Sequence, residues 1–573
     1  MYNQKIAELF EEIADMLEIE GGDHSFEIRA YRKAAMNLSV LQEDVGDILE
    51  KEGTEGLMKI PGIGKGLAER IREYVEKGHM SKYEALKKKY PIDFNSLTKI
   101  QGLGARKVLK LYSSLHVKNI EDLKKAVAQH KIRALEGFGE KSESEIAKGL
   151  QLLESARGRM PLGTALPEAE SIIKTISDSG FADRVVIAGS TRRMRETVGD
   201  LDILVTSATP QKIMDLVASL KEAEHVVVSG PTKTTIQLRM GLSCDVRVVE
   251  PSSFGAALQY FTGSKEHGIA IRQIAVRKGL KLNEYGLFDK KGKVVASKTE
   301  EEIYGKLGLQ YIEPEMREAR GEVALAAEHR LPKLIEQKEI RGDLHTHTDN
   351  SDGQNTIEEM IEAAVRKGYS YIGLSDHSKS EYIAHGMDDK RFAKYFDEID
   401  KVAEKYEGII EVLKSGEVDI LKDGTLDVNK STLDRMDYRI GAVHMNRNMS
   451  RDEMTKRILG AFDEGINILA HPTGRLINER EPIDFDTDKV FHAAKDKGVI
   501  MEVNAFPNRL DLNDENIIKA RSYGIKFAID TDSHKTEHLD FIKYGIGTAR
   551  RGWLTKGDVV NTLDADALKR IFR

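Results

Sequence analysis

“RGDLHTHTDNSDG”, at residues 341–353, is the stretch that decides the fold of the C-terminal part of the chain. Successive side chains of a strand point to opposite faces, so His345 and His347 point to the same face and are spaced to share one metal ion. Asp352 follows in a glycine-bearing turn. A single His-x-His pair is equally compatible with a solvated loop, so the choice depends on the rest of the chain.

Strand-like segments alternate with helical segments rich in Ala, Glu and Lys after residue 340. They read “RGDLHTHT”, “YSYIGLSDH”, “IIEVLKSGEVDI”, “DYRIGAVH”, “INILAHP”, “VIMEVNA” and “KFAIDTDSH”. Seven such repeats predict a parallel β/α barrel over residues 341–573. A barrel gathers its strand ends at one rim. Metal-binding residue types stand at or just after these ends, and they are His345, His347, Asp352, His377, Glu417, His444, His471, Asp532 and His534.

These nine side chains exceed what one ion needs, so we expect two or three divalent cations with Glu417 as the bridging carboxylate. Imidazole-rich ligation favours Mn²⁺ or Zn²⁺ over Mg²⁺, and such metals activate water for attack on phosphorus at neutral pH. The alternative is a set of scattered structural histidines, which the recurrence at strand ends disfavours. Arg475 in “HPTGR” is a predicted phosphate contact.

A second group of acidic residues lies in the middle of the chain. “VVIAGSTRRMRETVGDLDILV”, residues 185–205, predicts a strand, a Gly-Ser turn and a second strand whose alternation puts Asp200 and Asp202 on one face. “CDVRVVE” supplies Asp245 in a similar context. Three neighbouring carboxylates repel one another unless cations neutralise them, and two Mg²⁺ ions suit phosphoryl transfer. Gly189 would let a triphosphate approach closely, and Ser190 and Arg193 would donate to it. An exposed polar strand edge is the alternative.

Two segments near the N-terminus repeat one pattern. “IPGIGKGLAERI”, residues 60–71, and “IQGLGARKVLKL”, residues 100–111, each predict a tight glycine turn before an amphipathic helix. Backbone N–H groups at such a helix start can meet a phosphate, and these contacts read no base sequence. The predicted DNA-contacting residues are Gly62, Gly64, Lys65, Gly102, Gly104, Arg106 and Lys107. An ordinary helical hairpin is the alternative, and “LEGFGEKSESEI”, with acidic residues after its glycines, is expected to be only a helix cap.

Composition limits the class of protein. At 573 residues several domains are expected, and the single cysteine, Cys244, excludes an intrachain disulfide. No window approaches the about 18 apolar residues that cross a membrane, so we expect a cytoplasmic protein without a membrane partner. The net charge of −7 is uneven. Residues 59–133 hold 18 Lys or Arg against 7 Asp or Glu, whereas residues 1–58 hold 5 against 14, so only the former region suits phosphates.

“GSTRRMRETVGDLDILV”, “YFTGSKEHGIAIR” and the two hairpins, in this order, closely resemble the family X DNA polymerases over residues 1 to about 315. Residues 341–573 resemble a PHP (polymerase and histidinol phosphatase) domain with all nine ligand positions filled. The resemblance implies a multidomain α+β and α/β protein. Its expected parts are a helical DNA-binding domain (1–88), a fingers-like helical domain (89–155), a nucleotidyltransferase palm with a mixed sheet (156–250), a nucleotide-closing subdomain (251–315), a charged helical linker (316–340) and a seven-stranded PHP barrel (341–573).

The resemblance also implies an activity and its partners. We expect a gap-filling repair DNA polymerase that uses Mg²⁺ or Mn²⁺, coupled to a 3′–5′ exonuclease, 3′-end phosphoesterase or abasic-site endonuclease in the barrel. Gapped or primer-template DNA and deoxynucleoside triphosphates would be its partners, Na⁺ or K⁺ would sit at the hairpin turns, and the chain would be a monomer. Asp200, Asp202 and Asp245 would be catalytic metal ligands. The residues near the nucleotide or template would include Tyr260, Phe261, Gly263, Ser264 and Arg272.

The sequence departs from the family pattern at two positions. Where family members with lyase activity carry a Schiff-base lysine, this chain has Arg70, which stays protonated and cannot form an imine. We therefore expect no lysine-dependent deoxyribose-phosphate lyase. Gly268 stands where an asparagine usually faces the nascent base pair, which puts fidelity in question.

Two other function classes share parts of this pattern. An RNA or small-molecule nucleotidyltransferase fused to a phosphatase would use the same Gly-Ser and Asp-x-Asp elements, but the duplicated hairpins and Tyr260-Phe261 disfavour it. A non-catalytic DNA-binding scaffold would need only one closed metal shell, whereas this chain carries complete carboxylate and histidine sets.

Overall fold

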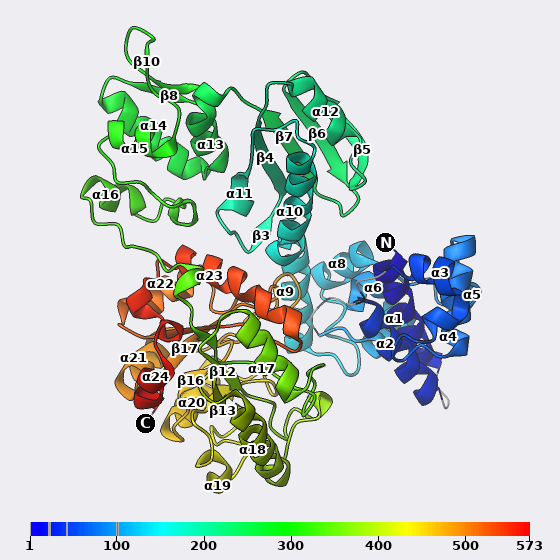
Figure 1. Ribbon diagram of the computed structural model, residues 1–573. Helices are drawn as coiled ribbons and strands as arrows, with labels where there is room; N and C mark the ends of the chain where they lie inside the picture. The colour runs from blue at the N-terminus through cyan, green and yellow to red at the C-terminus, as the bar shows by residue number, and fades with distance from the viewer. Residues whose placement is uncertain are drawn as a thin grey trace. The chain divides into compact units, whose positions relative to one another are not determined.

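The computed structural model describes residues 2–20, 24–39, 41, 44–98, 100, 102–156 and 158–572. The chain divides into two compact units (Figure 1). The first comprises residues 1–157 with 478–481, and the second comprises residues 158–477 and 482–573. Among the described residues, no helix is both long and apolar enough to cross a membrane.

The first unit is helical and contains both repeated hairpins. Gly62 and Gly102 occupy the left-handed region with φ of 80° and 86°, a conformation that glycine adopts without strain. Gly64 and Gly104 then precede the helices that follow each turn. The helices are α1 (Tyr2–Glu20), α2 (Ser25–Ser39), α3 (Val45–Leu57), α4 (Lys65–Lys77), α5 (Ser81–Lys89), α6 (Phe94–Thr98), α7 (Ala105–Leu115), α8 (Ile120–Ala128) and α9 (Glu140–Ala156).

The second unit begins with a mixed five-stranded sheet in the order β2-β4-β7-β6-β5. Leu201 and Ile203 on β4 and Cys244 and Val246 on β7 point to one face, where they pack with helices α10 and α12. The carboxylates at alternate positions therefore lie on the other face. The elements are β1 (Met160–Pro161), α10 (Leu162–Asp178), β2 (Arg184–Ile187), α11 (Gly189–Arg192), β3 (Thr197–Val198), β4 (Asp200–Thr206), α12 (Pro210–Ala218), β5 (Ala223–Ser229), β6 (Lys233–Leu238) and β7 (Ser243–Val248).

A small subdomain follows the sheet and contains a buried ion-pair network. Glu300 accepts hydrogen bonds from Arg317 Nη1 at 2.6 Å and from Arg192 Nη2 at 2.6 Å, so it joins this subdomain to α11. The guanidinium of Arg317 is fully buried. The elements are α13 (Phe254–Thr262), α14 (Lys265–Arg277), β8 (Lys281–Asn283), β9 (Gly286–Phe288), β10 (Val294–Ala296) and α15 (Glu300–Lys306).

The segment expected to be a charged helical connector differs from that expectation. Between residues 316 and 340 it contains one six-residue α-helix, α16 (Glu322–Ala327). Glu322 is buried against His267, and Arg317 is buried on Glu300, so charged residues that resemble a solvated linker are part of the core. Charge composition misled here because each buried charge has a partner elsewhere in the chain.

The C-terminal region has the predicted seven strand segments, all parallel to their neighbours. The third is interrupted at Ser415 and Gly416, so it forms β13 and β14. Single bridges, His377 to Glu417 and Thr346 to Ser533, connect the three-stranded and five-stranded sheets at both edges. The strands are β11 (Gly342–Asp343), β12 (Tyr371–Leu374), β13 (Glu411–Lys414), β14 (Glu417–Asp419), β15 (Ile440–Ala442), β16 (Ile468–Leu469), β17 (Ile500–Asn504) and β18 (Phe527–Asp530).

Helices separate these strands along the chain, and the predicted fold class is confirmed. Apolar side chains such as Ile361, Phe396, Ile458 and Phe491 pack between the helices and strands. The helices are α17 (Ile357–Arg366), α18 (Asp389–Ala403), α19 (Lys430–Leu433), α20 (Arg451–Asp463), α21 (Thr487–Lys497), α22 (Asp514–Ser522), α23 (Ile542–Arg551) and α24 (Ala565–Phe572).

The buried Glu300 network yields a stability prediction. Replacing Glu300 with Gln leaves the Arg317 charge buried without its counter-ion, which should lower the free energy of unfolding by about 3–5 kcal/mol. Burial opposes ionisation of Glu300, but Arg317 and Arg192 outweigh it and lower the pKa of the carboxyl to about 2. The carboxylate's contribution is therefore complete above its unfolded pKa of about 4.3 and is lost as the pH falls toward 2.

Urea unfolding of the wild type and Glu300→Gln at pH 7 and pH 4 measures this contribution. The difference between the two proteins should shrink at the lower pH, and Glu301→Gln, at an exposed neighbouring position, is the matched control. Equal stability of the wild type and Glu300→Gln at pH 7 would contradict the prediction.

Candidate metal centres

Glu417 lies at the centre of a cluster of imidazoles at the rim of the barrel. It begins β14, and its side chain is fully buried. Its Oε1 lies 2.7 Å from His471 Nε2 and 3.1 Å from His444 Nε2, and its Oε2 lies 2.9 Å from His377 Nδ1. The His345 and His347 Nε2 atoms lie 3.3 and 3.6 Å from the same Oε2. Both carboxylate oxygens thus face several potential metal ligands, as a bridging carboxylate requires.

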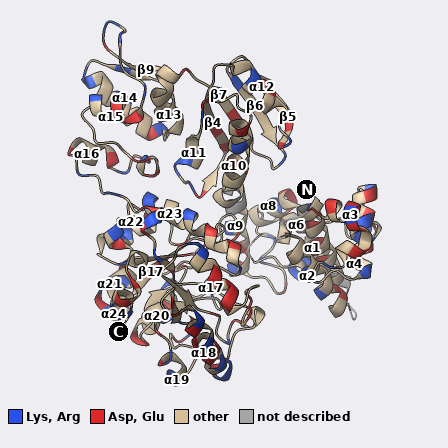
Figure 2. Cartoon of the chain, viewed as in Figure 1, with Lys and Arg blue, Asp and Glu red and all other residues tan. Residues whose placement is uncertain are grey.

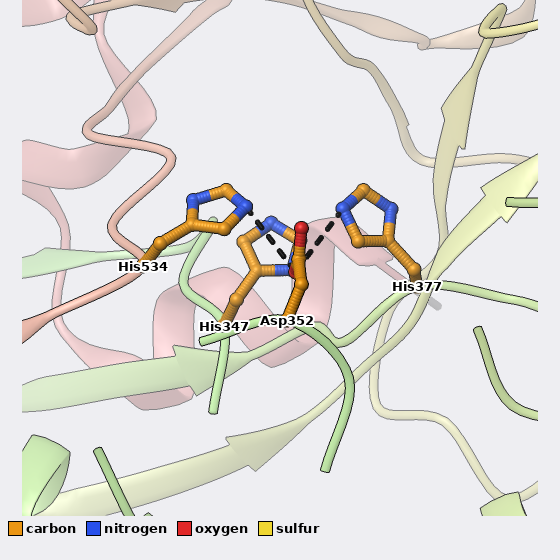
Figure 3. Close-up of side chains that lie close together, drawn as sticks. All are labelled: His347, Asp352, His377 and His534. Carbon is orange, nitrogen blue, oxygen red and sulfur yellow. Dashed lines mark ion pairs between the residues drawn. The ribbon is translucent and has the colours of Figure 1, made fainter. Parts of the chain in front are cut away.

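A second group shares His347 and His377 with the first. Asp352 Oδ1 lies 3.4 Å from His534 Nε2 and 3.7 Å from His377 Nε2, and these side chains point toward one another (Figure 3). His347, Asp352, His377 and His534 form a group whose ligand atoms all lie within 4.8 Å of one another. Asp532 Oδ1 is 3.1 Å from His347 Nε2. The structure therefore brings together all nine residues that the sequence placed at this rim.

Carboxylates behind the histidines orient the rings. Glu502 Oε1 lies 2.6 Å from His345 Nδ1, and Asp419 Oδ1 lies 3.2 Å from His444 Nδ1. Such partners fix the tautomer, so the opposite ring nitrogen is free to bind metal. The sequence-based prediction omitted Glu502 and Asp419. Their signal is an acid at an inward position of a buried parallel strand, in “EVD” and “MEVN”, where apolar residues are usual.

Unsatisfied atoms provide a test of whether metals fit. Within the described part of the chain, His345 Nε2, both ring nitrogens of His347, His377 Nδ1 and Glu417 Oε2 are buried without a hydrogen-bond partner. Buried polar atoms are almost always satisfied, so their clustering at one rim indicates a ligand that completes them. The donors are mainly imidazole nitrogens with bridging carboxylates, which fits transition-metal dications such as Mn²⁺ or Zn²⁺.

The pKa values at the rim move in opposite directions for different histidines. Burial opposes protonation of His444, but Glu417 and Asp419 outweigh it and raise the pKa to about 10. Burial, together with His534 and His377, lowers the pKa of His347 to about 3. Neighbouring groups with such divergent pKa values are typical of functional sites.

The three carboxylates of the palm meet on two adjacent parallel strands. Asp202 on β4 is the direct Cα partner of Asp245 on β7, and Asp200 lies two residues earlier on the same face. Figure 2 shows the acidic residues of this sheet in red. Burial, then the charges of Asp200 and Asp245, raise the pKa of Asp202 to about 7. The arrangement suits hard divalent cations, because every donor is a carboxylate oxygen.

Cationic side chains already neutralise part of this charge. Lys233 Nζ and Arg247 Nη2 each lie 2.8 Å from Asp245 Oδ2, and Thr235 Oγ1 donates to Oδ1 at 2.6 Å. Burial opposes ionisation of Asp245, but these contacts outweigh it and lower its pKa. Lys233, Thr235 and Arg247 were absent from the sequence-based prediction, because only the pairing of β6 with β7 brings the first two to Asp245.

The structure gives a local reason for a glycine at position 189, which the sequence did not indicate. Its φ is 63°, and a Cβ there would lie 2.4 Å from Asp202 Oδ2. A side chain would therefore displace a predicted metal ligand, whether or not a triphosphate approaches. The adjacent Ser190 lies in the first turn of α11.

The other residues predicted near the nucleotide surround the end of α13. Tyr260 is 42 % exposed, whereas Phe261 lies against Arg247, whose guanidinium is 4.6 Å from the ring centroid. Gly263 and Ser264 join α13 to α14, and the Ser264 hydroxyl caps α14 by accepting from a backbone N–H. Arg272 lies on α14, one turn after Gly268.

Arg193 and Arg475 are each bound to a glutamate. Arg193 Nε donates to Glu318 Oε1 at 3.0 Å. Arg475 Nη2 donates to Glu196 Oε2 at 2.7 Å and to the Leu510 carbonyl at 2.6 Å. A phosphate role for either arginine therefore requires that these contacts be exchanged or shared.

In each hairpin the glycine turn leads directly into a helix, and the space beside Gly64 and Gly104 is open. A Cβ at Gly64 or Gly104 would meet no atom within 4 Å, so a phosphate has room at both sites. Lys65 is exposed, and Arg106 lies 3.6 Å from Glu18. Lys107 instead donates to the carbonyl of Gly102, at 2.9 Å, within its own hairpin.

Family models match four parts of the chain. They are a helix-hairpin-helix domain at residues 1–80, a SAM-like helix-hairpin-helix tandem at residues 94–151, a DNA polymerase beta thumb at residues 257–318 and a PHP domain at residues 343–505.

Curated relatives match at different lengths. The chain is 37 % identical to the DNA polymerase/3′-5′ exonuclease PolX of Bacillus subtilis (strain 168), over 100 % of this chain and 99 % of the relative. It is 27 % identical to DNA polymerase lambda of Rattus norvegicus, over 55 % of this chain and 56 % of the relative. A Leishmania infantum polymerase beta structure, in a ternary P/T complex, matches at 22 % identity with a TM-score of 0.27, over 39 % of this chain and 97 % of that one.

The raised pKa of Asp202 predicts proton release when a divalent ion binds the palm. Near pH 6 the metal-free carboxyl is largely protonated, so binding should release close to one proton, and almost none at pH 8.5. The apparent affinity of the palm for Mg²⁺ should fall as the pH drops below 7. The raised pKa of Asp202 also affects folding. Because the native state binds this proton more tightly than the unfolded state, the contribution of Asp202 to the free energy of unfolding rises as the pH falls from 7 toward 4.

Isothermal titration calorimetry with Mg²⁺ in buffers of different ionisation enthalpy measures the released protons. Comparison of the wild type with Asp202→Asn removes the contribution of the barrel. Equal proton release by the two proteins at pH 6 would show that Asp202 does not titrate there.

Proposed function

The chain belongs to the PolX family of DNA polymerases, the family X type with a C-terminal PHP domain, and from this premise we propose that it fills short gaps in DNA with its palm and trims 3′ ends with its barrel. The observation that carries the proposal is the presence of two separate ligand groups in one chain. One consists of carboxylates on the palm strands, and the other is built from imidazoles and carboxylates at the barrel rim.

In the palm, Asp200, Asp202 and Asp245 would hold two Mg²⁺ or Mn²⁺ ions. Bound there, such ions supply stabilisation of the charge that develops on the transferred phosphoryl group. Asp245 would assist the primer 3′-OH, which requires its contacts with Lys233 and Arg247 to loosen. Ser190 and Arg193 would bind the triphosphate.

The incoming nucleotide would lie at the end of α13. Tyr260 offers an exposed aromatic face to the sugar, and Phe261 is kept in place by Arg247. Gly263 and Ser264 would lie beside the nucleotide, while Arg272 on α14 would face the template strand. These roles follow the family pattern residue by residue.

In the barrel, the nine rim residues would hold two or three Mn²⁺ or Zn²⁺ ions with Glu417 as the bridge. Such ions supply an activated water and stabilise charge on a phosphodiester. Glu502 and Asp419 would hold the rings of His345 and His444 in orientation. The reaction would be 3′–5′ exonuclease cleavage, with 3′-end phosphoesterase or abasic-site endonuclease cleavage as related reactions on the same bond type.

DNA would be held through its backbone by the two hairpins. Gly62 and Gly102 make the left-handed turns, and Gly64 and Gly104, which provide no side-chain cap, leave backbone N–H groups open at the starts of α4 and α7. Lys65 and Arg106 would add charge at the contact, and Na⁺ or K⁺ would sit at the turns. Contacts of this kind set register without reading sequence, as gap repair at arbitrary positions requires.

Two double variants test whether polymerisation and 3′ degradation occur at separate centres. Asp200→Ala with Asp202→Ala should lower extension of a primer in gapped DNA by about 10³-fold or more and leave 3′ degradation intact. His345→Ala with His347→Ala should do the reverse. Loss of both activities in the same variant, with unchanged thermal unfolding, would contradict two separate centres. Addition to RNA 3′ ends in preference to gapped DNA would favour the RNA-directed alternative.

Absence of a lysine-dependent lyase is a second prediction. Arg70 occupies the relevant helix, and its guanidinium lies 5.8 Å from the centroid of the Tyr31 ring. Borohydride should trap no covalent adduct between the wild type and a 5′-deoxyribose-phosphate end, because arginine cannot form the imine. Arg70→Lys, which supplies an amine at the same position, is the matched comparison. A trapped wild-type adduct would identify another nucleophile and overturn the prediction.

A further inference from the structure

Helix α23 of the barrel lies beside the loop that follows α11 in the palm (Figure 1). We call residues 193–196 the palm loop. Arg551, the last residue of α23, donates from Nη1 to the carbonyl of Arg193 at 2.8 Å. Met194 packs onto Gly547 of the same helix, where a Cβ would lie 2.5 Å from Met194 Cε. The barrel thus fixes the backbone of the loop that carries Arg193.

Glu318 connects the same two residues through their side chains. Its carboxylate accepts from Arg551 Nη1 at 2.8 Å, Arg193 Nε at 3.0 Å and Arg195 Nη1 at 3.4 Å. Side-chain exposure is 9 % for Glu318, 4 % for Arg551 and 12 % for Arg193, so solvent screens these contacts weakly. Arg551 has a second counter-ion in Asp514, so Arg193 and Arg195 together carry more positive charge than Glu318 alone neutralises.

Arg193 uses two of its five N–H donors in this arrangement, including the Nε donor that faces Glu318. Its Nε is bound to Glu318, and its Nη1 donates to the carbonyl of Thr262 at 2.5 Å. A triphosphate that binds Arg193 must therefore share the guanidinium with Glu318 or displace it. Arg551 acts against that competition, since it draws Glu318 toward itself and holds the Arg193 carbonyl.

We propose that Glu318 and Arg551 are positioning residues that set the affinity of the palm for deoxynucleoside triphosphates, with opposite signs. Glu318 competes with the triphosphate for Arg193. Arg551, although it belongs to the barrel, weakens this competition and anchors the palm loop. The inference rests on the proposed function, because it takes Arg193 to bind the triphosphate.

Opposite effects of substitutions at Glu318 and Arg551 on nucleotide affinity distinguish this role from that of a structural ion pair. Glu318→Gln keeps the Arg551 bond to the Arg193 carbonyl but removes the competing charge, so KM for the nucleotide and the Kd of the nucleotide complex should fall about 5-fold. Arg551→Met should raise both by about 5-fold or more, because Glu318 then binds only Arg193 and Arg195. The kcat should change less than KM in both variants. An ion pair that merely stabilises the fold predicts harm from both substitutions.

Single-nucleotide gap filling gives KM and kcat, and calorimetric titration with the triphosphate gives the Kd. Arg550→Met is the matched control, because Arg550 precedes Arg551 on α23 but pairs with Glu313 and Glu315, so its loss should leave KM unchanged. In an Arg193→Gln background the effect of Glu318→Gln should disappear.

The outcomes are separable from failure of the proposed function. A rise in KM and Kd for Glu318→Gln, or changes of the same sign in both variants, would overturn the inference while gap filling by the wild type still supports a polymerase. Persistence of the Glu318→Gln effect in Arg193→Gln would also overturn it. If Arg551→Met folds poorly, as its thermal unfolding would show, the sign of the Glu318→Gln effect decides alone. A wild type that neither binds triphosphates nor extends primers would instead overturn the proposed function.

Discussion

Each buried carboxylate in this protein needs a cation or a set of hydrogen-bond donors, and that constraint determines where the chemistry lies. An ionised carboxylate removed from water loses several kcal/mol of solvation unless cations or N–H donors replace it. Glu417 meets this need with imidazoles from four other strand ends. The palm meets it differently: Asp245 is paired with Lys233 and Arg247, while Asp202 responds with a pKa near 7.

The two solutions suit different metals. Imidazoles are neutral ligands that leave a transition-metal ion with open positions, and their tautomers are set by carboxylates behind them, such as Glu502. Carboxylates on adjacent strands instead form a shallow, highly charged surface suited to hard ions that retain water. One fold region thus concentrates ring nitrogens and the other concentrates oxygens. The two regions suit different metals because their strands present different residue types, and not only because the two sites are buried to different extents.

Local patterns predicted the barrel strands and the inward-facing residues well, because alternation and strand ends are properties of a few neighbouring residues. The palm carboxylates were also predictable, since Asp200 and Asp202 alternate along one strand. What the sequence could not supply is pairing between distant segments. The contacts of Lys233 with Asp245 and of Arg193 with Glu318 depend on tertiary register. The prediction of a charged helical linker at residues 316–340 was wrong for a related reason, because charged residues of this segment are buried against partners elsewhere in the chain.

Both arginines predicted to bind phosphate are held by glutamates at the junction of palm and barrel. Arg193 is held by Glu318, which Arg551 also binds, and Arg475 is held by Glu196. Within the described residues Arg475 Nε is buried without a hydrogen-bond partner, so that side chain has a donor to spare.

The contact between Arg475 and Glu196 also connects residues that lie close in sequence to the two metal sites. Arg475 lies four residues after the barrel ligand His471, and Glu196 lies four residues before Asp200. If each arginine takes a phosphate as predicted, its bond to a glutamate at the junction must be shared or exchanged. Because binding free energies are reciprocal, any change that phosphate binding makes to these glutamate contacts is matched by an equal effect of the contacts on phosphate binding. The junction therefore contributes to affinity at both sites, although it contains none of the metal ligands.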